Sequence, residues 1–431
     1  MFVELAVAAG VTYALDKYRN REFNKEEKIF RNTCMILDKS FLIINSWITP
    51  YGNKFLISLK NKEYTELEKL KGLLETNFAA RVEIEQNETM SSAYVYVIKR
   101  RLNDKEFKFT TYKCKPNEIY LGLDNKLEPI VVNMNTFPHI LLSGTTGSGK
   151  SEELRIILSN LISNNTSRDI ELYFSNISLS NDFYQFLNCN QVKGYVEEIQ
   201  ESLQLFRYLN YVYEKRLSIF RSRNCIDIKE YNKKFNEKRM TYIYLCIDEF
   251  ADYFPANQRD NLYDLKIKCY NELRQLSRKA RKAGIFLVVA IQRPDTTVLD
   301  PSLRSNLCTK IGFYQNNDAS SLTVCDTVEL TKIREREFLA IYGNKKFWSR
   351  SLYISKNIVY ENIKKSLVKN RQKKDDFNDF LKDNKFVYMD QDNKKNRDKI
   401  IDKPKPAKKV AKQSTKKEKT KIRNVEILKI S

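Results

Sequence analysis

The stretch ILLSGTTGSGKSEELRIIL, residues 140–158, constrains the fold more than any other part of the chain. A short apolar run ends in a glycine-rich loop with a lysine and a serine, and a helical pattern of apolar residues follows. The loop has the spacing G-x-x-x-x-G-K-[ST] of a phosphate-binding loop, which is a specific signal when a strand precedes it and a helix follows it. We therefore predict a strand, loop and helix unit that binds nucleotide phosphates.

Each residue type in this loop has a physical reason to be there. Glycines let backbone N–H groups wrap a phosphate, and the start of the helix adds partial positive charge. Lys150 is expected to reach the β and γ phosphates and Ser151 to bind Mg²⁺, so ATP and Mg²⁺ are the predicted cofactors. The predicted nucleotide-binding residues are Gly144, Thr145, Thr146, Gly147, Ser148, Gly149, Lys150 and Ser151.

Two further apolar runs end in polar residues suited to hydrolysis. YIYLCIDEF ends in Asp248, predicted to hold Mg²⁺ through water, and Glu249, the predicted base for the attacking water. Two carboxylates at the end of a buried strand would be costly without a metal or a basic partner. VVAIQRP ends in Gln292, an amide suited to sensing the γ-phosphate. The predicted catalytic residues are therefore Glu249, Lys150 and Gln292, and the predicted metal ligands are Ser151 and Asp248.

The spacing of apolar runs predicts the fold class. Continuous apolar runs at 140–143, 170–174, 242–247 and 285–291 alternate with helical stretches, which indicates an α/β fold with a mainly parallel sheet covered on both faces. Before it, a hairpin pattern at 41–60, a helix at 64–75 and a strand at 93–98 predict a small α+β unit. The predicted division is an apolar segment at 1–20, a small α+β domain at 30–118, an ATPase domain at 119–358 and a disordered basic tail at 359–431.

Charge and residue usage restrict the partners and the chemistry. Against 54 Asp and Glu stand 76 Lys and Arg, a net charge of +22, which indicates a polyanionic partner, either nucleic acid or an anionic membrane surface. Eight cysteines without a CxxC pair indicate reduced thiols in a cytoplasmic protein. The single histidine, His139, argues against imidazole metal sites and Ser-His-Asp chemistry.

The N-terminal run FVELAVAAGVTYAL, residues 2–15, is apolar but interrupted by Glu4, and it is shorter than the about 20 residues of a helical membrane span. Two interpretations remain open. The run forms a docking helix or peripheral membrane contact, or it is a plain amphipathic packing helix.

Several motifs in a fixed order carry a family resemblance. PHILLSGTTGSGKS, YNKKF, IDEFADYF and LSRKARKAGIFLVVAIQRPD resemble the FtsK/SpoIIIE DNA translocases over roughly residues 119–345. The hairpin LGLDNKLEPIVVNM and the unit before it are similar to translocases encoded by conjugative plasmids and integrative elements, the TcpA-like coupling proteins. Two departures stand out: SNIS at 175–178 replaces the family's usual aspartate-proline-lysine, and Lys310 replaces an arginine.

The resemblance implies a RecA-like motor that forms a hexameric ring around double-stranded DNA and couples ATP hydrolysis to movement. By similarity, the loop FRSRNCIDIKEYNKKF would face the channel, and a sequence-independent motor is expected to grip phosphates with basic side chains. The C-terminus lacks a winged-helix pattern, so orientation is expected to come from partner proteins. The implied DNA contacts are Arg223, Lys233 and Lys234, and the candidate arginine fingers acting on a neighbouring subunit are Arg274 and Arg304.

Three functions remain to be separated. The first is an ATP-driven double-stranded DNA translocase serving conjugative transfer of a mobile element, cytoplasmic and at the inner face of the cell membrane, with a relaxase or membrane channel as partner. The second is an ATP-switched DNA-binding adaptor that recruits these partners without processive pumping. The third is a peptide or protein secretion ATPase, which would not be stimulated by DNA.

Removal of the tail tests its predicted role as a polyanion contact. Residues 401–423 hold ten basic and two acidic residues. We expect a chain that ends at residue 400 to bind DNA or anionic vesicles more weakly, with a shallower salt dependence, because fewer counterions are released. ATP hydrolysis should persist. An unchanged salt dependence of binding would argue for protein contacts instead.

Overall fold

The computed structural model describes residues 25–36, 40–255, 257–368 and 377. The predicted N-terminal segment at 2–15 and the basic stretch at 401–423 lie outside these residues. None of the helices within the described ranges has an apolar stretch long enough to cross a membrane.

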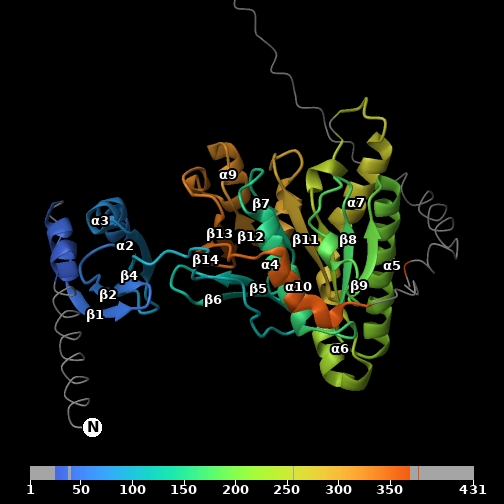
Figure 1. The fold of residues 1–431 in the computed structure, drawn as a ribbon, viewed down its shortest axis with the longest axis horizontal. Helices are drawn as coiled ribbons and strands as arrows, with labels where there is room; N and C mark the ends of the chain where they lie inside the picture. Colours follow the sequence, from blue (N-terminus) through green and yellow to red (C-terminus); the bar gives the residue numbers. More distant parts are fainter. Residues whose placement is uncertain (1–24, 37–39, 256, 369–376, 378–431) are drawn as a thin grey trace, which may run out of the picture. The chain divides into compact units, whose positions relative to one another are not determined.

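An eight-stranded sheet forms the centre of the fold, and its strand order is β14-β13-β12-β7-β11-β10-β8-β9 (Figure 1). All pairings from β12 to β9 are parallel, whereas β13 and β14 add an antiparallel edge. This arrangement confirms the predicted α/β fold with a mainly parallel sheet. The strands are β7 (Ile140–Ser143), β8 (Ile170–Ser175), β9 (Val192–Val196), β10 (Tyr242–Ile247), β11 (Ile285–Ile291), β12 (Thr309–Gly312), β13 (Glu337–Tyr342) and β14 (Lys345–Arg350).

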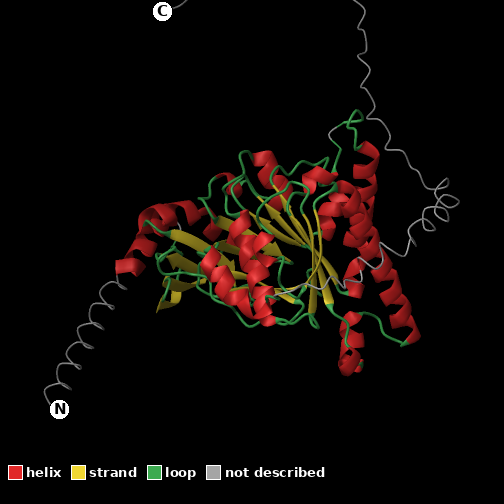
Figure 2. Cartoon of the chain, turned by 45° about the vertical axis from the view of Figure 1, so that its right-hand side comes forward, coloured by secondary structure: helices red, strands yellow, loops and turns green. Residues whose placement is uncertain are grey.

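Helices cover both faces of this sheet, which explains why its central strands are apolar without alternation (Figure 2). The P-loop helix α4 packs against α10 on one face. On the other face α5 packs along α7, and Tyr208 of α5 lies 5.9 Å, centroid to centroid, from Tyr173 of β8. The helices are α4 (Lys150–Asn164), α5 (Ile199–Ser222), α6 (Ile228–Lys234), α7 (Tyr263–Lys279), α8 (Pro301–Asn306), α9 (Asp318–Cys325) and α10 (Lys356–Ile363).

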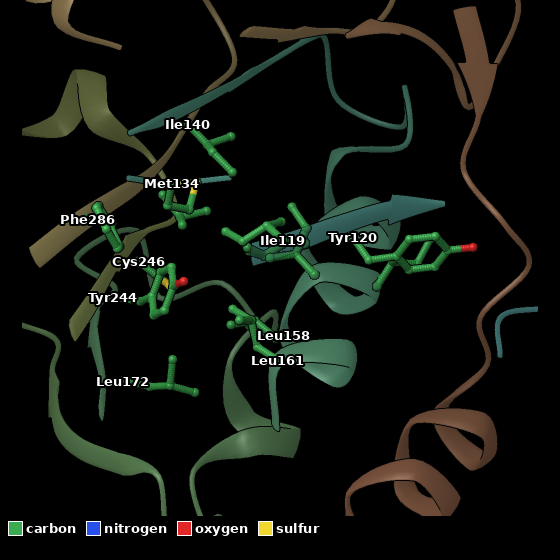
Figure 3. Close-up of a cluster of buried hydrophobic side chains, with 14 of the residues drawn as sticks. Ile119, Tyr120, Met134, Ile140, Leu158, Leu161, Leu172, Tyr244, Cys246 and Phe286 are labelled. Carbon is green, nitrogen blue, oxygen red and sulfur yellow. The ribbon is translucent and has the colours of Figure 1, made fainter. Parts of the chain in front are cut away.

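The core on the α4 face is closed by the predicted hairpin, which forms β5 (Glu118–Leu123) and β6 (Pro129–Asn133). Figure 3 shows Ile119 and Met134 of the hairpin region near Leu158 and Leu161 of α4 and the strand residue Tyr244. The Tyr244 side chain is fully buried, and its hydroxyl donates to the carbonyl of Pro116 at 2.8 Å. The hairpin therefore joins P-loop helix and sheet in one apolar cluster.

The N-terminal unit is a four-stranded antiparallel sheet of order β1-β2-β4-β3 with short helices. The helix predicted at 64–75 is two helices that meet at Leu70, and β3 was not predicted. Residues 25–36 are also helical. The elements are β1 (Ile43–Thr49), β2 (Gly52–Ser58), α2 (Tyr64–Lys69), α3 (Lys71–Phe78), β3 (Arg81–Gln86) and β4 (Ser92–Ile98).

The described chain continues past β14 into helix α10, whose Val359 and Ile363 are buried. The predicted start of the tail at residue 359 falls inside this helix. Leu367 then forms an isolated antiparallel bridge with Cys189, three residues before β9 begins. The division of the chain into domains remains a prediction.

The buried His139 predicts a pH dependence of stability. Its Nδ1 accepts a hydrogen bond from the Leu287 N–H at 3.0 Å, and its backbone has a left-handed φ of 62°. Burial, assisted by the charge of Arg281, lowers the pKa of His139 to about 3. Because the unfolded chain binds a proton near pH 6.5 and the native state does not, His139 should destabilise the fold as the pH falls below that value.

The matched variant is His139→Asn, since asparagine tolerates a left-handed φ and offers a side-chain acceptor. We expect the free energy of unfolding of the variant, minus that of wild type, to increase by up to about 1.4 kcal/mol for each unit that the pH falls between 6.5 and 4.5. Urea unfolding at several pH values measures this difference. Two curves that stay parallel across that range would contradict the assignment.

Candidate active site

The parallel pairing brings the ends of four strands to one edge of the sheet. Ser143 of β7 pairs with Ile291 of β11, and Ile247 of β10 pairs with Val289 of β11 and with Ser175 of β8. The residues that follow these strands therefore lie along one edge: the P-loop, Gln292, the pair Asp248 and Glu249, and the segment from residue 176. Such an edge is the usual ligand site of an open α/β sheet.

The P-loop requires its glycines for steric and conformational reasons. Gly149 has φ 116°, and a Cβ there would lie 2.9 Å from the Cα of Arg336. A Cβ on Gly144 would lie 2.5 Å from the Cβ of Phe313. Gly147 has φ 77° and faces open space. Gly149 and Gly144 thus let the loop approach neighbouring residues closely, and all three glycines fit a phosphate-cradling loop.

Lys150 begins helix α4 and its ammonium lies inside the loop. Its Nζ donates to the carbonyl of Gly144 and, at 3.2 Å, to the carbonyl of Thr145. Burial lowers the pKa of Lys150 to about 8, although the charges of Glu249 and Asp182 oppose this shift. The lysine is thus a partly desolvated cation with two carboxylates in its field.

Glu249 is held by two backbone amides, one after β10 and one after β11. Its carboxylate accepts from the Gln292 N–H, with Oε2 at 3.0 Å, and Oε1 accepts from the Ala251 N–H at 3.3 Å. The Gln292 side chain accepts from the Thr146 hydroxyl at 2.9 Å. Burial raises the pKa of Glu249 to about 7, while the amides and Lys150 act in the opposite direction. The three predicted catalytic residues therefore lie close together, and Gln292 connects Glu249 to the P-loop.

Asp248 has an environment suited to a metal-bound water. Its side chain is 8% exposed, and one oxygen accepts from the Ser178 hydroxyl. The other oxygen, Oδ1, is buried and has no hydrogen-bond partner among the described residues. Burial raises the pKa of Asp248, whereas its bonds with Ser178 and Ser180 lower it. A buried carboxylate oxygen without a hydrogen-bond partner fits Mg²⁺, which favours oxygen ligands and retained waters.

The segment after β8 contributes residues that the sequence did not reveal as part of the site. The Ser151 hydroxyl donates to Asp182 at 2.7 Å, and Arg155 lies 3.7 Å from the same carboxylate. Ser178 belongs to SNIS, which stood out only as a departure from the family pattern. Its position directly after a strand that neighbours β10 was the available signal, because parallel neighbours end at the same edge.

A polar cleft of about 550 Å³ opens beside this constellation. Thr145, Thr146 and Gln292 line it, together with Arg293 and the segment around Asn316. Its size and polarity suit a phosphorylated ligand better than an apolar one.

The predicted DNA contacts lie at the opposite edge of the sheet. Arg223 follows α5, and Lys233 and Lys234 are the last residues of α6, which precedes the start of β10, whereas the nucleotide residues follow the ends of the strands (Figure 1). Arg223 lies over the ring of Phe235 at 5.9 Å, and Lys234 donates to the Arg223 carbonyl at 3.1 Å. Lys233 is exposed. These three side chains form one exposed basic cluster.

Both predicted arginine fingers are engaged within their own chain. Arg274 lies 3.5 Å from Asp300, and Arg304 pairs with Asp326, which also contacts Lys310 at 3.2 Å. Among the described residues, neither arginine contacts the P-loop of its own chain.

Comparisons with known proteins agree with this architecture. Residues 98–296 match the FtsK/SpoIIIE family model. The chain contains an FtsK/SpoIIIE domain. The chain is 24% identical over 277 residues to the DNA translocase FtsK of Treponema pallidum, covering 56% of the chain and 33% of that protein. It is 26% identical over 243 residues to the FtsK of Staphylococcus aureus, covering 53% and 29%. The chain thus spans about a third of the length of these relatives.

Solved structures show the same fold. The pCW3 conjugation coupling protein TcpA, in a monomer form with ATPγS, superposes with a TM-score of 0.55 at 21% identity, over 79% of this chain and 99% of TcpA. The cytoplasmic domain of the type VII secretion ATPase EccC from Thermomonospora curvata superposes with a TM-score of 0.52 at 17% identity, over 64% and 34%. The FtsK/SpoIIIE domain therefore has the RecA-like P-loop ATPase fold.

Two substitutions should separate nucleotide binding from hydrolysis. Lys150→Ala removes the cation of the P-loop, and we expect ATPγS binding to be lost in calorimetry. Glu249→Gln keeps the size and hydrogen-bonding capacity of the side chain but removes the base, so ATP should still bind while kcat falls by about 10²-fold or more. Near wild-type turnover of Glu249→Gln would show that another group accepts the proton.

Proposed function

We propose that the protein is an ATP-driven translocase of double-stranded DNA that acts as a hexameric ring. The observation that carries this proposal is the pair of sites on one sheet: a nucleotide constellation at the carboxyl ends of its strands and an exposed basic cluster at the amino end of β10. The FtsK/SpoIIIE domain supports it, because the relatives matched are named DNA translocases.

Hydrolysis follows from the roles that the site supports. P-loop amides and Lys150 hold the β and γ phosphates, and Glu249 accepts the proton as water attacks the γ-phosphorus and ADP departs. Gln292 would sense the γ-phosphate, because its side chain bonds to Thr146 and its N–H bonds to Glu249. Ser151 and Asp248 would hold Mg²⁺, which neutralises phosphate charge. A carboxylate whose pKa lies near 7 accepts a proton effectively at neutral pH.

The basic cluster supports binding that is independent of DNA sequence. Arg223, Lys233 and Lys234 are suited to phosphate contacts, which fix position without reading bases. In a ring, each ATP would lie at a subunit boundary, and Arg274 or Arg304 would reach the neighbour's site after leaving its own carboxylate partner.

We further propose a role in conjugative transfer of a mobile element, with a relaxase or membrane channel as partner, in the cytoplasm at the inner face of the cell membrane. The likeness in fold to the coupling protein TcpA supports this setting over 79% of the chain. The same likeness also favours the second candidate, an ATP-switched DNA-binding adaptor. The likeness in fold to EccC favours a third candidate, a secretion ATPase, which the experiment below distinguishes.

The rate of ATP hydrolysis with duplex, single-stranded and no DNA separates the three functions. We expect duplex DNA to stimulate hydrolysis most, and displacement of a third strand from a linear triplex to require ATP and Glu249. The charge-removing variant Lys233→Ala/Lys234→Ala should lower stimulation but keep the basal rate. Stimulation without strand displacement would support the adaptor, and a rate indifferent to DNA would support the secretion ATPase.

A further inference from the structure

Arg336 lies directly behind the P-loop, at a position that no predicted role covers. Its N–H donates to the Ser148 carbonyl at 2.9 Å, and its Cα faces Gly149 at the distance that excludes a Cβ there. Ser148 in turn donates its hydroxyl to the Thr145 carbonyl at 2.7 Å. A displacement of Arg336 would therefore alter its contacts with two consecutive P-loop residues, Ser148 and Gly149.

The backbone of Arg336 has an unfavourable conformation for its residue type. Its φ is 64°, in the left-handed region that favours glycine. A large side chain persists there only when its surroundings hold it, and such positions cluster at functional sites. Here the side chain is 10% exposed and its guanidinium donates to the Ser351 carbonyl at 2.8 Å.

The guanidinium also contacts Asp104: its Nη1 lies 2.9 Å from both carboxylate oxygens. Arg350 of β14 contacts the same carboxylate. Burial alone would raise the pKa of Asp104, but Arg350 and Arg336 hold it below its ordinary value, so the carboxylate is charged at neutral pH. Hydrogen bonds between two charged groups are among the stronger ones, and Asp104 holds the guanidinium through Nη1 only, while the Ser351 carbonyl accepts from Nη2.

Asp104 belongs to the linker, residues 99–117, which joins β4 of the four-stranded sheet to β5. The linker also lies along the P-loop helix, where the Tyr112 N–H donates to Asn160 at 2.8 Å and Asn164 donates to the Tyr112 carbonyl at 3.0 Å. The linker therefore contacts Arg336 through Asp104, and it contacts two asparagines of helix α4 through the backbone of Tyr112.

We propose that Arg336 is a positioning residue of the P-loop and that Asp104 couples its position to the linker, so that nucleotide binding and the arrangement of the linker depend on each other. This inference rests on the proposed nucleotide site. By linkage, a linker that holds Arg336 in place raises nucleotide affinity, and bound nucleotide stabilises the linker to the same extent.

The test uses the full chain with Asp104→Asn, Arg336→Gly and the double variant. Glycine accepts the left-handed φ, so Arg336→Gly should keep the melting temperature of the fold while losing the pair. We expect each single variant to weaken ATPγS binding by about fivefold or more, with kcat at saturating ATP within about twofold of wild type. The double variant should bind as weakly as the single ones, because one pair is lost in all three.

A matched control is Glu106→Gln, which removes a carboxylate of the same linker that pairs with Arg100 rather than with Arg336. It should leave ATPγS affinity unchanged. Hydrogen exchange provides a second measurement: ATPγS should slow exchange in the linker of wild type and of Glu106→Gln, but not of Asp104→Asn.

Three outcomes would overturn the inference: unchanged affinity of Asp104→Asn, effects of the single variants that multiply in the double variant, or linker protection that persists without Asp104. If ATPγS did not bind at the P-loop at all, Lys150→Ala would bind it as well as wild type does. That result would overturn the proposed nucleotide site and is distinct from the three outcomes above.

Discussion

Parallel pairing of β7, β11, β10 and β8 is the constraint on which the site depends. Parallel strands end at the same edge, and here each strand end delivers one chemical function: phosphate cradle, amide, paired carboxylates and serine hydroxyls. The strands can pair this way because they are apolar on both sides and covered by helices on both faces. Placement of Gln292 between the P-loop and Glu249 follows from the position of β11 between β7 and β10.

Burial at this edge gives the charged groups their properties. Lys150, Asp248 and Glu249 all have pKa values displaced toward their neutral forms, with desolvation as the largest cause in each case. Hydrogen bonds from hydroxyls and amides partly compensate, but Oδ1 of Asp248 stays without a partner among the described residues. The site is thus electrostatically incomplete by itself, which suits a site that takes a polyanion together with a cation.

Most of the fold could be predicted from the sequence because its signals are local. Apolar runs predicted β7, β8, β10 and β11, and the loop spacing predicted the position of Lys150. Strand β3, RVEIEQ, carries too few apolar residues for its short length and was missed. The bond between Ser151 and Asp182 spans 31 positions, and the pair of Arg336 and Asp104 spans 232. Neither follows a periodic pattern, so only the folded chain reveals them.

One strand separates the two proposed working ends of the protein. Six residues of β10, Tyr242–Ile247, lie between the segment after α6 and Asp248, a length of about 20 Å at a rise of about 3.3 Å per residue. All six are buried, and the five from Ile243 to Ile247 pair with a strand on each side. A strand so enclosed resists sliding or bending by itself, which favours coupling of its two ends through rotation of the sheet and its helices as a rigid body. The stroke of such a motor would accordingly be set by how far whole subunits turn against one another, not by the flexibility of any loop.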